Sequence, residues 1–135
     1  MEWVIDSGAT HHITNEIDKM SKIKTLMQPL KMGCANSGNL IIDRVGQVIM
    51  KNPYDNQMVK LTKVRYAKNC PKNLLSERRL RHKIIFLTLG NEKHLIDRET
   101  GKTLHIAKQD GRFWLVKMTP MQLSLIHISE PTRPY

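Results

Sequence analysis

Short apolar stretches separated by turn-forming residues recur along almost the whole chain. The clearest stretch is residues 58–66, where apolar and polar side chains largely alternate, as on a strand with one buried face. Residues that favour turns lie between the stretches, at positions 36–39, 52–56, 90–91, 100–101 and 110–111. Many short strands at regular spacing predict a mainly β fold, in the form of a small barrel or sandwich.

The strand pattern covers residues 3–5, 30–35, 40–42, 47–51, 58–66, 84–89, 93–97, 103–107 and 113–117. Gly46 lies between two of these strands and predicts a bend or a bulge. Apolar residues at helix-like spacing predict a short helix or an irregular segment over residues 16–27, and residues 73–80 fit a short helix. The fold we expect is a small β-barrel with one short helix, followed by extra β-hairpin strands.

The charge of the chain is strongly positive. The 135 residues carry 22 Lys and Arg against 12 Asp and Glu, a formal net charge of +10, which favours polyanions such as nucleic acid. The cations are dispersed, so solvation of the strand faces explains them equally well. The densest patch has no interleaved aromatic residue and does not predict a base-stacking platform: it comprises Arg78, Arg79, Arg81, His82 and Lys83. We therefore expect only weak nucleic-acid contact.

Several site types have no support in the sequence. Cys34 and Cys70 form no Cys-x-x-Cys pair, so a zinc site is not predicted, and buried reduced thiols fit better than a disulfide, which stays open. No apolar run reaches the ~20 residues that span a membrane, and the N-terminus has no secretory pattern. We expect no cofactor, no metal and no membrane contact, and a soluble product of the cytoplasm.

One motif carries chemistry. Asp6 ends an apolar run and is followed at once by Ser7 and Gly8. Aspartic proteases need an aspartate in this setting, because two such carboxyls approach closely, share one proton and activate a water. Gly8 lets the backbone come close, and Ser7 supplies a hydroxyl to brace the loop. Asp-Ser-Gly alone is also a common strand-ending turn.

A family resemblance strengthens this interpretation. Residues 3–14, WVIDSGATHHIT, resemble the protease signature of copia-type retrotransposon Pol polyproteins, and stretches at 30–33, 64–66 and 73–76 follow in the family's order. The last of these begins 67 positions after Asp6 (73 − 6) and is similar to the apolar turn that backs the catalytic loop of retropepsins. The resemblance covers roughly residues 3–117.

The resemblance implies an aspartic endopeptidase with a retropepsin-like barrel. It makes Asp6 the catalytic residue, with a supporting loop and a backing turn formed by Ser7, Gly8, Ala9 and Thr10 and by Asn73, Leu74, Leu75 and Ser76. Because the chain holds a single Asp-Ser-Gly, a two-aspartate site would require a homodimer. The implied substrate is the Gag-Pol polyprotein, and the implied location is a cytoplasmic virus-like particle.

The same resemblance divides the chain into three parts. Residues 1–83 are expected to form the barrel, and residues 84–122 look like the start of the GAG-pre-integrase region. Residues 123–135, LSLIHISEPTRPY, resemble translated sequencing-adapter sequence, so we expect them to add no structure. Met1 lies five residues before the motif, which suggests that a lead-in strand is missing.

Two other hypotheses remain open. The chain could be an inactive transposon-derived fragment, or a non-catalytic basic β-barrel that binds RNA or Gag. His11 and His12 invite a metal or base role, but neighbours on an extended chain point to opposite faces, so a structural or solvent-facing role is the better interpretation. Ser7 lacks the Gly-x-Ser-x-Gly context of a serine nucleophile.

Overall fold

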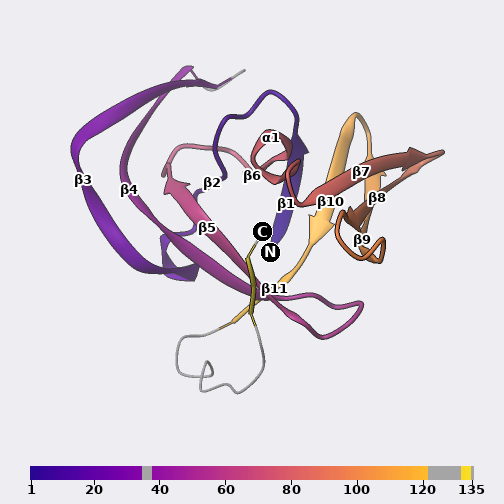
Figure 1. Ribbon diagram of the computed structural model, residues 1–135. Helices are drawn as coiled ribbons and strands as arrows, with labels where there is room; N and C mark the ends of the chain where they lie inside the picture. The colour runs from indigo at the N-terminus through magenta and orange to yellow at the C-terminus, as the bar shows by residue number, and fades with distance from the viewer. Residues whose placement is uncertain (35–37, 122–131, 135) are drawn as a thin grey trace.

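The computed structural model describes residues 1–34, 38–121 and 132–134, and it confirms the mainly β fold (Figure 1). The elements follow this order: β1 Glu2–Asp6, β2 Ile13–Thr14, a 3₁₀ turn η1 Ile17–Lys19, β3 Met20–Cys34, β4 Gly38–Lys51, β5 Met58–Tyr66, β6 Asn73–Ser76, α1 Glu77–Leu80, β7 Ile84–Leu89, β8 Glu92–Asp97, β9 Thr103–Asp110, β10 Phe113–Lys117, β11 Thr119–Pro120 and β12 Thr132–Pro134.

One hydrogen-bonded sheet contains all the strands of the described residues. Its main path runs β11-β4-β5-β2-β6-β1-β10-β9-β8-β7, with β3 beside β4 and β12 beside β5. At its centre, β6 lies between β1, to which it is parallel, and β2, to which it is antiparallel. Because β1 and β2 are joined by residues 7–12, this loop passes around the end of β6. The topology thus places the Asp-Ser-Gly loop directly against the segment that begins at Asn73.

The longest strands form a curved hairpin at one side of the molecule (Figure 1). β3 pairs with β4 with register shifts between Ser21 and Lys24 and between Thr25 and Leu30. Of the short helix or irregular segment expected over residues 16–27, only the single turn η1 is helical, and residues from Met20 onward belong to the irregular start of β3. The apolar spacing there did not mark a buried face, because Ile23 and Met27 are exposed and the backbone instead bonds to β4.

Gly46 marks the irregularity that the sequence predicted. The β4–β5 register shifts between Gly46 and Val48. A Cβ at Gly46 would lie 2.8 Å from the carbonyl oxygen of Ser21, closer than such atoms approach, so a larger residue cannot fit without movement of β3.

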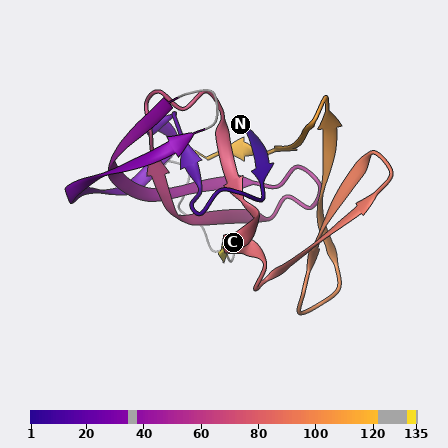
Figure 2. The ribbon, with the colours of Figure 1, turned by 90° about the horizontal axis from the view of Figure 1, so that it is seen from above.

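Residues 84–117 form antiparallel strands, as predicted, with one register shift between β8 and β9 at Leu95 and Ile96. β7, β8, β9 and β10 pair in sequence, and Figure 2 shows them on the opposite side of the molecule from the β3–β4 hairpin. The turns between them carry Gly90, Gly101 and Gly111, all with positive φ, a conformation that glycine adopts without steric cost. β10 then pairs with β1, which joins the meander to the rest of the sheet.

The core is continuous across residue 83. Trp3 is fully buried and its indole N–H points at the sulfur of Met50, at 3.2 Å. The same apolar cluster includes Leu80 from α1, Leu95 from β8 and Val116 from β10. Residues on both sides of the predicted boundary therefore stabilise one another by burial of apolar area.

The structure adds detail at residues 73–80 and in the C-terminal segment, where the local sequence pattern was less informative. Residues 73–80 are half strand and half helix: β6 ends at Ser76, whose side chain caps α1 by accepting from the Arg79 N–H at 3.3 Å. In the C-terminal segment, residues 132–134 pair in parallel with β5, while 122–131 and 135 lie outside the described residues. No helix in the described part of the chain is long and apolar enough to cross a membrane.

Candidate functional site

Asp6 lies at the end of β1, where buried backbone gives way to an exposed loop. Trp3, Val4 and Ile5 are buried, whereas Asp6 is partly exposed and Ser7 and Gly8 are exposed. The Gly8 N–H donates to Asp6 Oδ1 at 2.8 Å. The loop thus holds one carboxylate oxygen and leaves the carboxylate accessible to a ligand.

Strand β6 braces this loop from behind. Asp6 is opposite Ser76 in the parallel β1–β6 register. The Ser76 hydroxyl donates to the carbonyl oxygen of Ala9 at 2.6 Å, and the Ser76 N–H donates to His12 Nδ1 at 2.9 Å. The segment that resemblance assigned to a backing turn is therefore a strand. Its last residue binds the catalytic-loop candidate at two points, on either side of exposed Thr10.

Asn73 anchors the other end of β6 with both ends of its amide. Its Oδ1 accepts from the Thr14 hydroxyl at 2.7 Å, and its Nδ2 donates to the Glu2 carbonyl at 3.0 Å and to Glu16 Oε2 at 2.8 Å. One buried side chain thereby ties β1, β2 and β6 together. Leu75 packs in the main core and Leu74 against the smaller one. The sequence singled out Asn73, but nothing local pointed to Thr14 or Glu16 as its partners.

His12 is a structural group, as the sequence suggested. Its side chain is 1% exposed, and burial, followed by the nearby Arg79 and His11, lowers its pKa to about 3. The ring is therefore neutral at neutral pH. Since Nδ1 accepts a hydrogen bond from Ser76, the ring proton resides on Nε2. His12 thus acts as a buried acceptor that fixes the loop against β6.

Three more polar side chains gather next to this contact. Arg79 Nη1 lies 3.4 Å from His11 Nδ1, and burial together with Arg65 and Arg79 lowers the pKa of His11. The backbone N–H of Arg65 donates to the His12 carbonyl at 2.9 Å, which places this residue of β5 beside the loop, and burial and the charge of Arg79 lower the pKa of Arg65. We call His11, Arg65 and Arg79 the cationic cluster. Its members come from the loop, β5 and α1, and the sequence pattern did not bring them together.

A single chain supplies one carboxylate at this place. Among the described residues, no hydrogen bond or ion pair joins Asp6 to a second acid, and no group of three His, Cys, Asp or Glu side chains is arranged to hold a metal ion. The arrangement therefore offers an accessible, braced carboxylate that lacks a partner carboxylate within the described chain.

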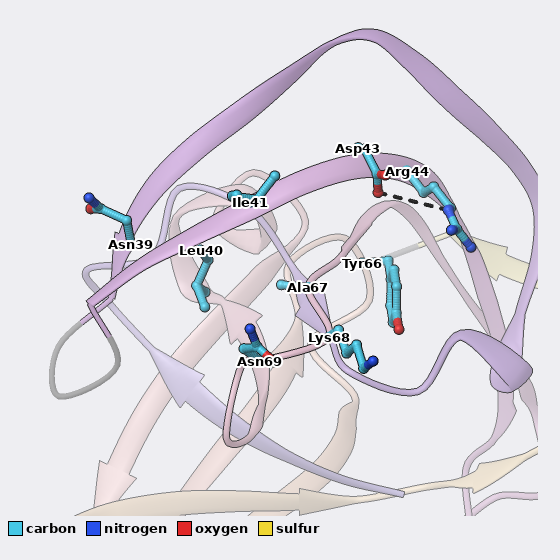
Figure 3. A pocket seen from close by; sticks show the side chains of 9 residues that line it. All are labelled: Asn39, Leu40, Ile41, Asp43, Arg44, Tyr66, Ala67, Lys68 and Asn69. Atoms are coloured by element: carbon cyan, nitrogen blue, oxygen red, sulfur yellow. Dashed lines mark ion pairs between the residues drawn. The ribbon is translucent and has the colours of Figure 1, made fainter.

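Two pockets lie away from Asp6. One, of about 470 Å³, lies between β4 and the residues after β5 (Figure 3). Leu40 and Ala67 form its apolar part, Tyr66 and Lys68 flank it, and the Arg44 guanidinium lies 5.6 Å from the Tyr66 ring centre. The other, of about 380 Å³, lies near Met1, Glu16 and Lys72. Asp6 lines neither pocket.

A second buried polar cluster lies where the β4–β5 turn meets β9. Asn52 Nδ2 donates to the Leu104 carbonyl at 2.5 Å, and Asn52 Oδ1 accepts from the Tyr54 N–H at 3.1 Å. His105 Nδ1 lies 3.4 Å from the same Oδ1, and the His105 and Tyr54 rings meet edge to face at 4.8 Å. Burial lowers the pKa of His105 to about 4, although Asp55 acts in the opposite direction. Asn52 and His105 are buried, whereas Tyr54 is exposed, and the cluster holds the β4–β5 turn against β9.

A known protein family matches the part of the chain that contains the Asp6 loop. The family described as "Pol polyprotein, beta-barrel domain" matches residues 3–85, which include β1, the Asp6 loop, β6 and α1. The chain is also 35% identical over 82 residues to the retrovirus-related Pol polyprotein from transposon RE2 of Arabidopsis thaliana. That match covers 58% of this chain but only 5% of the much longer relative. No solved structure matches the chain significantly.

Proposed function

Because the chain belongs to the family of Pol polyprotein β-barrel domains, we propose that it supplies one half of an aspartic endopeptidase site, with Asp6 as the catalytic carboxylate. The observation that carries this proposal is the bracing of the Asp6 loop. One carboxylate oxygen is held by Gly8, and the loop behind it is bound twice by Ser76. An ordinary strand-ending turn would not need this support from a distant strand.

The second half of the site would come from another copy of the same chain. A two-fold dimer places the same residue of each protomer at the axis, so two Asp6 side chains can face one another. Two carboxylates at short range cannot both ionise, and the pair therefore holds one shared proton. The ionised member takes a proton from a water as it attacks the peptide carbonyl, and the protonated member donates to the carbonyl oxygen.

The residues around Asp6 have matching roles in this proposal. Ser7, Gly8, Ala9 and Thr10 shape the loop, and Asn73 to Ser76 hold it from behind through the contacts described above. The reaction uses the chain's own carboxylates and a water, and it requires no cofactor or metal.

The substrate in this proposal is the polyprotein of a copia-type element. The domain would cut Gag-Pol inside a cytoplasmic particle, and residues 84–122 would begin the GAG-pre-integrase region. Support comes from the order of motifs in the sequence and from similarity to a transposon Pol polyprotein. The chain spans about 5% of that relative's length, so the proposal is limited to the endopeptidase step and includes no other activity of the polyprotein.

A cleavage assay with purified 135-residue chain tests the proposal. The substrate is a Gag-Pol segment, and sedimentation over a range of protein concentrations reports self-association. We expect cleavage that rises with the dimer fraction and disappears in Asp6→Asn. A well-folded monomer that cleaves nothing at any concentration, or an Asp6→Asn chain that still cleaves, would overturn it.

A further inference from the structure

We propose that the cationic cluster of His11, Arg65 and Arg79 is a subsite that binds an acidic side chain of the peptide substrate. This inference rests on the proposed endopeptidase function and adds to it a preference for Asp or Glu near the cleaved bond.

The cluster has positive charge without a described counter-ion. Neither the Arg65 nor the Arg79 guanidinium makes an ion pair with an acid in residues 1–34 and 38–121. The acid on α1 is engaged elsewhere, because Glu77 lies 3.1 Å from Arg81 and 3.6 Å from Lys93. Two guanidinium groups that repel one another are stabilised when an anion binds between them.

Arg65 also has an unused hydrogen-bond donor. Its Nε is buried and has no acceptor among the described residues. A buried donor without a partner loses the hydrogen bond that water would provide, which destabilises the unliganded site. A carboxylate suits the partly exposed guanidinium of Arg65, because its two oxygens accept from the arginine fork in bidentate geometry once the side chain turns its Nε toward the ligand.

The cluster lies on the same structural support as Asp6. His11 belongs to the loop that starts at Asp6, and its neighbour His12 is bonded to Ser76, the residue opposite Asp6 in the sheet. Arg79 follows Ser76 by three residues, and its N–H binds the Ser76 hydroxyl. Figure 1 shows α1 beside the end of β1. In this proposal, a peptide placed over Asp6 extends toward the cluster along this shared support.

The surroundings favour a single carboxylate over a nucleic-acid strand. His11, Arg65 and Arg79 are each partly buried, which suits one small anion. A phosphate backbone is bound by rows of accessible cations, and the exposed cations Arg78, Arg81 and Lys83 are not members of the cluster. Burial, together with Arg65 and Arg79, lowers the pKa of His11 and so disfavours its charged form, which leaves the two arginines as the main source of positive charge in the cluster.

Paired peptides test the preference directly. Each pair consists of two labelled octapeptides with the same cleavable bond, one with Glu and one with Gln at a single position, and the position is moved along the peptide. We expect one position at which Glu raises kcat/KM about tenfold, mainly through KM, as expected for a hydrogen-bonded charge pair. Arg79→Glu should reverse the preference in favour of Lys at that position.

Arg78→Glu is the matched control. It makes the same change of charge one residue away, on an exposed side chain outside the cluster. We expect it to leave the Glu-to-Gln ratio unchanged. Equal effects of Arg78→Glu and Arg79→Glu would mean that only the overall charge matters, and would overturn the subsite.

Binding to the Asp6→Asn chain separates this inference from the proposed function. If the wild-type chain cleaves no peptide, the endopeptidase proposal fails, but fluorescence anisotropy with the same Glu and Gln peptides still reports on the cluster. Stronger binding of one Glu peptide that is lost in Arg79→Glu supports the subsite. No discrimination between Glu and Gln at any position overturns it, as does an Arg79→Glu effect confined to binding of a single-stranded RNA oligonucleotide.

Discussion

Two buried histidines hold two different parts of this molecule. His12 fixes the Asp6 loop to β6, and His105 holds the β4–β5 turn against β9. Both side chains are almost completely buried, and both have lowered pKa values, about 3 for His12 and about 4 for His105. Their tautomers differ, because His12 Nδ1 accepts from a backbone N–H, whereas His105 Nδ1 faces an amide oxygen and must donate.

The charges around the two histidines differ more than their burial does. The neighbour that acts on the His105 pKa is an acid, Asp55, and the Asn52 amide beside it is hydrogen-bonded at both ends. The neighbours that act on His12 are the cation Arg79 and a second histidine, and a partly exposed carboxylate, Asp6, lies at the start of the same loop. Satisfied polar groups indicate a structural joint. An excess of positive charge beside an accessible acid indicates a surface that binds another molecule.

The largest expected contrast comes from Asp6→Asn and Asn52→Ala. Asp6→Asn should reduce cleavage at least about a thousandfold, because the carboxylate that activates water is lost, with little change in melting temperature. Asn52→Ala should leave cleavage per folded molecule intact and reduce the free energy of unfolding. Cleavage kinetics and thermal melts on both variants check the contrast. The contrast is contradicted if Asn52→Ala lowers the activity per folded molecule as strongly as Asp6→Asn does.

Loss of the buried amides gives the next largest effect. Asn73→Ala and Asn52→Ala each leave several buried partners unsatisfied, and we expect losses of about 2–4 kcal/mol in the free energy of unfolding. Asn73→Ala should also loosen the Asp6 loop, so it should lower cleavage where Asn52→Ala does not. Urea unfolding gives the stabilities. Equal cleavage by the two variants per folded molecule would show that β6 does not position Asp6.

Acid should destabilise both joints. The native pKa of each histidine lies below the unfolded value of about 6.5, so above that pH both states are neutral and the histidines contribute no pH dependence. Below it, the unfolded chain binds protons that the native chain does not, and stability falls. For His12 the loss between pH 6.5 and 4.5 is about 2–3 kcal/mol.

Removal of either histidine sharpens this test. The wild-type chain, His12→Asn and His105→Asn are unfolded with denaturant at several pH values. In each variant the free energy of unfolding should fall less steeply with decreasing pH than in the wild type. Unchanged slopes would contradict the burial of neutral rings. If cleavage operates in the same acid range, the His12→Asn chain should also retain its Asp6 loop at lower pH than the wild type.

The smallest expected effect is at Gly8. A Cβ there would lie 3.4 Å from Asp6 Oδ1 and close to nothing else, so Gly8→Ala should change stability by less than about 1 kcal/mol. Gly46→Ala is the matched comparison, because its Cβ would clash with the Ser21 carbonyl at 2.8 Å, and it should cost roughly 1–3 kcal/mol. Thermal melts measure the change in stability of both variants. A larger loss of stability in Gly8→Ala than in Gly46→Ala would contradict the described loop geometry.

The sequence predicted the parts of the fold that depend on local pattern. Alternation over residues 58–66 marked β5, the turn residues marked the β7–β10 meander, and an apolar run ending in Asp6 marked β1. β3 was missed at its start, because its bulges break the alternation and its partner, β4, supplies the hydrogen bonds that make it a strand. Local pattern does not contain such pairings.

The site was predictable to the same extent. The motif located Asp6 and, by resemblance, residues 73–76, but not how they meet. The contact between His12 and Ser76 spans 64 positions, and the cluster of His11, Arg65 and Arg79 depends on three elements that only the sheet order brings together. Arg65 was expected to be one of the solvated polar residues of its strand. The alternation of apolar and polar residues shows which face of the sheet a side chain takes, but not which side chains from other elements lie next to it.

Mixing wild-type and Asp6→Asn chains measures the central claim most directly. If each site needs Asp6 from two chains, cleavage at constant total concentration should fall with the square of the wild-type fraction, so that a half-and-half mixture retains about a quarter of the activity. A fall in direct proportion to the wild-type fraction would show that one chain carries a complete site, and would contradict the account of Asp6 as a shared carboxylate.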